Sequence, residues 1–348
     1  MATDPTVPPV FTGRVARESN PGRPPQFAFS RFSQAARRLI VAGGIAALFG
    51  IGASAQEDAK DEAFTFRQGE RVVLIGSTLA DRLQHFGWLE LRLQLAHPDL
   101  HLSLRNMGWS GDEVALMPRP LDFGDLETHL TDQKADTILM CFGTNESFAG
   151  EAGLEKFRTD LRTLIERLSA VSFNGESPAR LVLVSPIAQE QLVAPWPDAA
   201  PRNLALEKYT AAMGEEAKAA GIRFIDLFHP TRSLMAENSG APLTINGLHP
   251  TSDGYRAISE ILALGLGVSD PLPRDEAAVQ GLRDLIIEKN REFMLRWRPV
   301  NAEYVFGRRK EPFGVLTFPP EMEQLDRQLT ALDEKIQAEA GKVAASKP

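Results

Sequence analysis

The sequence contains a single cysteine, Cys141, which lies in the apolar run Thr137-Ile-Leu-Met-Cys-Phe142. One thiol cannot build a disulfide framework within the chain, and it excludes a metal site made of several cysteines. The CxxCH haem-attachment motif is also missing. Cys141 is therefore expected to be a small buried hydrophobic residue in a strand.

The chain also lacks an excess of positively charged residues. The chain has 38 Lys and Arg residues against 46 Asp and Glu residues, which gives a net charge of −8. Binding to nucleic acid requires a concentrated basic surface, so nucleic acid is not expected as the main partner. Neither GxGxxG nor GxxxxGK[ST] occurs, and this absence disfavours a nucleotide-binding protein.

Only one long apolar stretch occurs, at residues 39–52, and Arg37-Arg38 precede it. The small residues Ala53-Ser-Ala55 follow it. A positive flank, a short apolar core and a small-x-small site are typical of a secretory signal peptide, with an uncleaved anchor as the alternative. We therefore expect residues 1–55 to comprise a disordered n-region and the signal peptide. The remaining protein would be periplasmic or secreted, with no stable membrane span.

Short apolar runs alternate with longer helical patterns over the next two hundred residues. This rhythm predicts a flavodoxin-like three-layer α/β/α sandwich with a five-stranded parallel sheet. Ligands of such sheets bind beyond the carboxyl ends of the strands. The expected strands are Arg71–Gly76, Leu100–Asn106, Thr137–Phe142, Arg180–Ser185 and Ile222–Asp226, and the expected helices are Leu79–Leu95, Leu154–Val171, Asn203–Ala220 and Ser252–Leu264.

The pattern changes after residue 268, and residues 269–348 are expected to form a C-terminal helical extension. A first helix is expected over Glu276–Phe293. Trp297 and Tyr304 lie among arginines and either pack the extension onto the body or line a sugar or partner site. The last helix carries an apolar stripe that is expected to dock on its own domain rather than to form a coiled coil. The stripe consists of Leu325, Leu329, Leu332 and Ile336.

Polar segments follow the predicted strands at the places where such a sheet holds its ligands. The segments are Val72-Val-Leu-Ile-Gly-Ser-Thr-Leu-Ala80, Asn106-Met-Gly-Trp-Ser-Gly-Asp112, Phe142-Gly-Thr-Asn-Glu146 and Thr244-Ile-Asn-Gly-Leu-His-Pro250.

Together these segments contain the groups that ester hydrolysis requires. The reaction needs a hydroxyl nucleophile, an imidazole that takes its proton, and donors aimed at the developing oxyanion. Ser77 or Thr78 would supply the hydroxyl at the positive end of a helix. Gly111 permits a close backbone approach, and Asn145 offers a side-chain amide donor. His249 can act as the general base.

The four segments resemble the blocks of the SGNH (GDSL-like) hydrolases: Gly-Asp-Ser, Asn-x-Gly-x-Ser-Gly-Asp, Gly-x-Asn-Asp and Asp-x-x-His. The resemblance covers roughly residues 68–266, so we expect the hydrolase-like domain at residues 56–268. It implies that Gly111 and Asn145 contribute to the oxyanion hole and that His249 is the base. The tail loosely resembles extensions on SGNH-like domains of planctomycete-type bacteria.

Two departures from the family pattern fall on reactive positions, so the nucleophile block is atypical. Aligning Gly76 with the family glycine places Thr78 in the serine slot, whereas a shift by one residue makes Ser77 the nucleophile. The methyl group of threonine restricts χ1 and crowds an incoming ester. Asn246 occupies the slot of the triad aspartate.

An amide at that slot does not stabilise imidazolium as a carboxylate does, and it can favour the wrong tautomer. In serine proteases the equivalent change costs about 10⁴ in rate. Asp226, Asp253 or a backbone carbonyl could orient His249 instead.

The resemblance implies a hydrolase acting on ester bonds without a metal or cofactor. We expect a small-molecule or carbohydrate ester as substrate, most simply an acyl or acetyl group on a carbohydrate. The alternative is a catalytically weakened SGNH-fold module that binds a glycan or a partner.

Overall fold

The computed structural model describes residues 64–300 and 302–345. The chain divides into one unit of residues 1–55 and a second of residues 56–348, and the fold below belongs to the second unit. The predicted n-region and signal peptide lie outside the described residues. No helix in the described ranges is long and apolar enough to cross a membrane.

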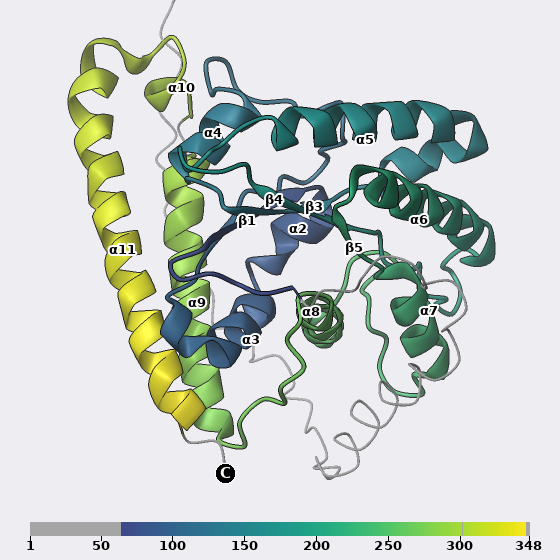
Figure 1. The fold of residues 1–348 in the computed structure, drawn as a ribbon. Coiled ribbons are helices and arrows are strands. Elements are labelled where there is room, and N and C mark those ends of the chain that lie inside the picture. Colours follow the sequence, from purple (N-terminus) through teal and green to yellow (C-terminus); the bar gives the residue numbers. More distant parts are fainter. Residues whose placement is uncertain (1–63, 301, 346–348) are drawn as a thin grey trace, which may run out of the picture. The chain divides into compact units, whose positions relative to one another are not determined.

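Five parallel strands form a single sheet in the order β2-β1-β3-β4-β5, which confirms the predicted fold class (Figure 1). The strands are rich in Val, Ile and Leu because helices cover both faces of the sheet. β1 lies between β2 and β3, so the strand order reverses at β1, and ligands of such sheets bind at the carboxyl ends of the strands beside this point. The strands are β1 (Arg71–Gly76), β2 (Ser103–Asn106), β3 (Thr137–Cys141), β4 (Arg180–Val184) and β5 (Arg223–Ile225).

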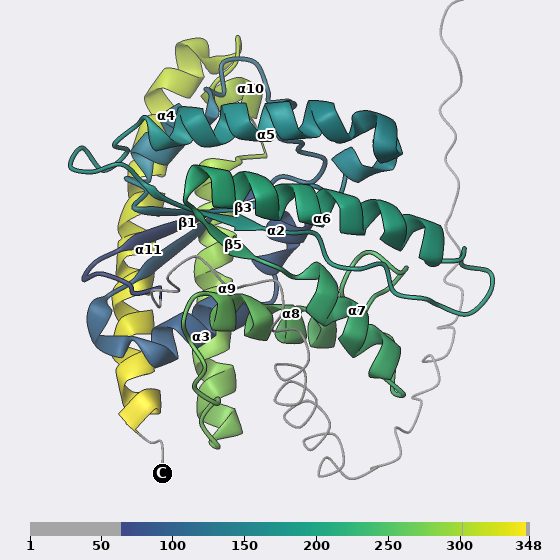
Figure 2. The same cartoon turned by 45° about the vertical axis from the view of Figure 1, so that its right-hand side comes forward.

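Each face of the sheet has its own apolar core. One face is covered by α4, α5 and α6, and the other by α2, α3 and α8, as both views show (Figures 1 and 2). The helices of this part are α2 (Thr78–Leu83), α3 (Trp88–Ala96), α4 (Leu126–Asp132), α5 (Leu154–Ser169), α6 (Ala200–Ala220), α7 (Phe228–Glu237) and α8 (Ser252–Gly265), with 3-10 turns η1 (Pro98–Leu100) and η2 (Glu146–Gly153).

The prediction of one helix over Leu79–Leu95 was wrong, because α2 and α3 are separate helices. The chain turns at Gly87, whose φ of +65° is a left-handed conformation that glycine adopts most readily. A Cβ atom at Gly87 would lie 3.2 Å from the side chain of Ile286. The turn therefore also makes room for the helix that contains Ile286.

That helix is α9 (Glu276–Trp297), and it packs beside the long α11 (Val315–Ala345) in the C-terminal extension (Figures 1 and 2). The short α10 (Ala302–Val305) and η3 (Lys310–Gly314) connect them. The predicted stripe on α11 docks on its own chain. Leu329 joins the core under α5, and Ile336 packs with residues of α3 and α9.

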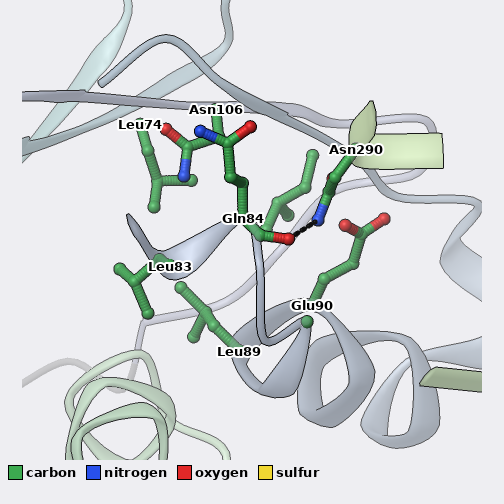
Figure 3. Close-up of a pocket in the computed structure, with 9 residues that line it drawn as sticks. Leu74, Leu83, Gln84, Leu89, Glu90, Asn106 and Asn290 are labelled. Atoms are coloured by element: carbon green, nitrogen blue, oxygen red, sulfur yellow. Dashed lines mark hydrogen bonds between the residues drawn. The ribbon is translucent and has the colours of Figure 1, made fainter. Parts of the chain in front are cut away.

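A buried polar joint links α9 to the body. The ammonium of Lys289 is fully buried, lies 2.7 Å from the Glu90 carboxylate, and donates to the Leu104 carbonyl at 2.8 Å. Beside it, the Asn290 amide donates to the Gln84 carbonyl at 3.0 Å, at the wall of a cavity of about 20 Å³ (Figure 3). The extension is therefore attached by polar as well as apolar contacts.

Candidate active site

The turn after β1 presents two hydroxyl groups in different environments. A Cβ at Gly76 would lie 2.1 Å from the Cys141 carbonyl oxygen, so only glycine fits where β1 ends. Ser77 follows as the N-cap of α2 and is 2% exposed, whereas Thr78, the first helical residue, is partly exposed. Within residues 64–300 and 302–345 neither hydroxyl forms a hydrogen bond. Thr78 is thus the more accessible of the two.

The segment after β2 packs over the first turn of α2. The Asn106 amide donates to the Ala80 carbonyl at 2.6 Å, and the Trp109 N–H donates to the Gly76 carbonyl at 2.9 Å. A Cβ at Gly108 would lie 2.4 Å from the backbone nitrogen of Asp81, so this contact also requires glycine. The loop is fixed directly beside the candidate nucleophiles.

Gly111 lies at the exposed tip of this loop, and its two neighbours are fixed. Ser110 donates its N–H and its hydroxyl to the same Asp81 carboxylate oxygen, at 3.1 and 2.5 Å. Asp112 is buried and forms a bidentate pair with Arg119 at 2.7 and 2.6 Å. Gly111 itself has a φ of +93°, and its N–H has no acceptor among the described residues. That N–H is available to a ligand.

Asn145, which follows β3, joins this loop. Its side-chain amide donates to the Asp112 carbonyl at 3.2 Å, which places it next to Gly111. Glu146, in the family's aspartate slot, accepts the N–H groups of Val114 and Gly143, each at 2.9 Å. Burial raises the pKa of Glu146. Glu146 therefore links the loop after β2 to the loop after β3.

The histidine loop is held by Glu190, which the sequence analysis did not identify. Glu190 is buried and accepts the N–H groups of Leu243 and Thr244 at 2.9 and 2.7 Å and the Thr244 hydroxyl at 2.6 Å. Its own N–H donates to the Gly247 carbonyl at 2.8 Å. Glu190 precedes the histidine loop by more than fifty residues, and no local motif marks it.

The side-chain oxygen of Asn246 sets the tautomer of His249. It accepts the backbone N–H groups of Leu248 and His249 at 3.2 and 2.9 Å, and it lies 3.0 Å from Nδ1 of His249. Because two backbone donors face it, this atom is the oxygen and not the amide nitrogen. Nδ1 therefore carries the proton, and Nε2 of the neutral ring is left as an acceptor. The amide imposes the tautomer that a general base needs.

The two aspartates named as alternative partners do not orient His249. Asp226 lies after β5 and pairs with Nδ1 of His229 at 2.5 Å. Asp253 is exposed in the first turn of α8. Asn246 is the residue that contacts the ring.

Burial lowers the pKa of His249, and the positive charge of Arg82 lowers it further. Arg82 follows Thr78 by four residues in α2, so the two share a helix face. His249 thus lies within electrostatic reach of the helix face that carries Thr78. Nε2 of His249 makes no hydrogen bond in the described part of the chain, and its contact with a hydroxyl stays a prediction. Sequence analysis missed Arg82, although its spacing from Thr78 was a usable signal.

No group of three or more His, Cys, Asp or Glu residues within the described ranges is placed to hold a metal ion. Hydroxyl groups, an imidazole, carboxamides and free backbone N–H groups gather at this edge of the sheet, and buried carboxylates hold the loops that carry them.

A model of the GDSL-like lipase/acylhydrolase family matches residues 76–257, just over half of the chain. The chain belongs to this family. Members of this GDSL-like (SGNH) family are hydrolases that act on ester bonds. The matched range includes every residue of the site described above.

The chain matches solved structures at low sequence identity. A gut microbial diltiazem-metabolizing enzyme is 12% identical, with a TM-score of 0.56 over 81% of this chain and 96% of its own. An alpha/beta hydrolase from the metagenome of Lake Arreo, Spain, is 18% identical, with a TM-score of 0.46 over 59% of this chain and 99% of its own. An acetylxylan esterase from Geobacillus stearothermophilus, solved as a catalytic mutant, is 17% identical, with a TM-score of 0.46 over 58% of this chain and 96% of its own. No curated protein matches the sequence.

Proposed function

We propose that this GDSL-like hydrolase cleaves carboxylic esters, with Thr78 as nucleophile and His249 as general base. One observation carries the proposal: the side-chain oxygen of Asn246 accepts a hydrogen bond from Nδ1–H of His249 and so leaves the Nε2 lone pair free. A general base needs this lone pair together with a neutral ring at working pH. Burial and Arg82 both favour the neutral ring.

Exposure favours Thr78 over Ser77 as the attacking group. Ser77, the N-cap of α2, is almost fully buried, whereas Thr78 is partly exposed. Thr78 is also the first helical residue, so its N–H has no partner within the helix. The same residue would supply the nucleophile and one donor to the oxyanion.

Three donors would stabilise the tetrahedral intermediate. They are the N–H groups of Thr78 and Gly111 and the side-chain amide of Asn145, which sits beside Gly111 through Asp112. Preorganised donors of this kind contribute about 10²–10³ each in rate.

The proposed reaction has two steps, acylation of Thr78 and hydrolysis of the acyl ester. The Thr78 hydroxyl adds to the acyl carbon as Nε2 of His249 takes its proton, and the alcohol then leaves with that proton. This forms an acyl ester on Thr78. Water, deprotonated by His249, adds to this ester, and the carboxylic acid leaves as the Thr78 hydroxyl regains its proton.

As substrate we propose an acyl, most simply an acetyl, ester of a carbohydrate. Two exposed aromatic side chains support a ring-shaped ligand: Phe148 follows Asn145 by three residues, and Trp196 lies in the loop after β4. Aromatic side chains are frequent in the walls of ligand sites. The apolar stretch at residues 39–52 supports action outside the cytoplasm.

A second candidate function is binding of a glycan without turnover. The observation that favours it is the uncharged Asn246, which cannot stabilise imidazolium as a carboxylate does.

Turnover of 4-nitrophenyl acetate and of acetylated xylo-oligosaccharide by the full chain separates the two functions. We expect turnover that falls by about 10³ or more in His249→Ala and Thr78→Ala but little in Ser77→Ala. Turnover that is unchanged in His249→Ala contradicts the mechanism, and saturable glycan binding without any turnover supports the second candidate.

A further inference from the structure

The last turn of α9 in the C-terminal extension reaches the loop that carries Gly111. Trp297 is 4% exposed and packs edge-on against Trp109, with ring centroids 5.6 Å apart. The guanidinium of the next residue, Arg298, lies 4.5 Å from the centre of the Trp109 ring. Trp109 precedes Gly111 by only two residues, so the extension contacts the oxyanion loop directly.

Arg298 also contacts the nucleophile helix. Its guanidinium lies 3.7 Å from the carboxylate of Asp81, which follows Thr78 by three residues in α2. The other oxygen of Asp81 accepts both hydrogen bonds from Ser110. Arg298 therefore stands where α2 and the oxyanion loop meet, and its charge supports the carboxylate that joins them.

Arg119 plays the corresponding part on the other side of Gly111. It pairs with Asp112, and its guanidinium lies 4.4 Å from the centre of the same Trp109 ring. On one side of Gly111, Ser110 is bound to the carboxylate of Asp81, and on the other side Asp112 itself carries a carboxylate. An arginine pairs with each of these carboxylates.

These arginines are needed because the two carboxylates are buried close together. Asp81 is 7% and Asp112 is 2% exposed. Burial raises the pKa of Asp112, Arg119 and Arg298 oppose this rise, and the charge of Asp81 adds to it. Removal of Arg298 would leave repulsion between Asp81 and Asp112 across the loop that presents Gly111.

We propose that Arg298 is a positioning residue of the oxyanion loop, so that the C-terminal extension forms part of the catalytic apparatus. The proposal rests on the proposed esterase function. A Cβ at Gly111 would meet no atom within 4 Å, and its φ is left-handed, so we expect the direction of its N–H to depend on Ser110 and Asp112. A donor that is loosely held stabilises the transition state less while substrate binding changes little.

The test compares Arg298→Ala with Arg296→Ala in the full chain. Arg296 is two residues away and pairs with Asp326 at 2.9 Å within the extension, so it is a matched control. We expect kcat for 4-nitrophenyl acetate to fall about 10- to 100-fold in Arg298→Ala, below the loss of a whole donor, with KM within about twofold. Arg296→Ala should retain the kcat and KM of the unsubstituted chain.

Hydrogen–deuterium exchange of peptides spanning residues 106–113 provides a readout that needs no turnover. We expect faster exchange there in Arg298→Ala and not in Arg296→Ala. Wild-type kcat together with unchanged exchange in Arg298→Ala would overturn the proposal. If the unsubstituted chain has no esterase activity, the proposed function fails, while the exchange comparison still decides whether Arg298 holds the loop.

Arg298→Lys covers the case in which Arg298→Ala does not fold. Lysine keeps the charge near Asp81 but loses the planar group over Trp109. We expect a smaller fall in kcat, about threefold to tenfold, with faster exchange in the same peptides. Unchanged kcat and exchange in Arg298→Lys would then contradict a role for the guanidinium.

Discussion

The side-chain oxygen of Asn246 lies 3.0 Å from Nδ1 of His249 and also accepts the backbone N–H of His249 at 2.9 Å. Two functions of a triad carboxylate are therefore separated in this protein. Asn246 fixes the tautomer of the ring, because the backbone holds its oxygen in place. It brings no negative charge to stabilise the imidazolium that the proposed mechanism would form.

Substitution of Asn246 by Asp supplies the missing charge. A carboxylate beside Nδ1 raises the pKa of His249, because it favours the protonated ring. The acid limb of the pH profile of kcat/KM should move to higher pH, and kcat above that limb should rise about tenfold. Asn246→Ala, which lacks the acceptor, should lower kcat. A lower kcat in Asn246→Asp at high pH would contradict this prediction, because it would show that a negative charge beside Nδ1 does not speed the reaction.

Arg82 has the opposite influence on the same ring. Its charge helps to lower the pKa of His249, although burial is the larger cause. In Arg82→Gln the pKa of His249 should rise toward its ordinary value, so His249 becomes protonated at higher pH and activity is lost earlier on acidification. Arg82→Lys keeps the charge and should keep the wild-type profile. Identical acid limbs in Arg82→Gln and the unsubstituted chain would argue against this coupling.

The methyl group of Thr78 should slow attack on the ester. Thr78→Ser removes the methyl group and frees χ1, so we expect kcat for 4-nitrophenyl acetate to rise about threefold to tenfold. Steady-state kinetics measure the change, with Ser77→Ala as the control that should leave kcat nearly unchanged. A large loss of kcat in Ser77→Ala would assign the nucleophile to Ser77.

Much of the fold is readable from the sequence because the buried strands carry continuous apolar runs. β1 occupies the range predicted, and the remaining strands differ from prediction only at their ends. The prediction of a single helix after β1 was wrong because the apolar pattern continues through Gly87. The chain turns at Gly87, where a tertiary contact with Ile286 favours glycine. The short α4 and α7 were also not predicted, since neither extends beyond ten residues.

The sequence predicts which residue types form the candidate site but not how their side chains are oriented. Family blocks point to His249 and Asn246, yet which amide atom faces the ring depends on two backbone N–H groups of the folded loop. Glu190 and Arg298 reach the site from distant parts of the chain. No spacing in the sequence relates them to the residues that they hold.

The buried ion pair between Lys289 and Glu90, which attaches the extension to the body, should contribute to stability. Lys289 and Glu90 are almost completely buried, so Lys289→Met leaves an unpaired carboxylate in the interior. We expect the free energy of unfolding to fall by about 3–5 kcal/mol, measured by urea denaturation. The double variant Lys289→Met/Glu90→Leu should recover most of this loss. Equal destabilisation in the single and double variants would contradict the account of this pair.

Covalent labelling tests the central claim most directly, because it identifies the nucleophile and its base together. The full chain is treated with diethyl 4-nitrophenyl phosphate, which transfers a diethylphosphoryl group to an activated hydroxyl, and the labelled peptide is identified by mass spectrometry. We predict one adduct on Thr78, with labelling largely abolished in His249→Ala and retained in Ser77→Ala. An adduct on Ser77, or labelling of Thr78 that does not depend on His249, would contradict the account.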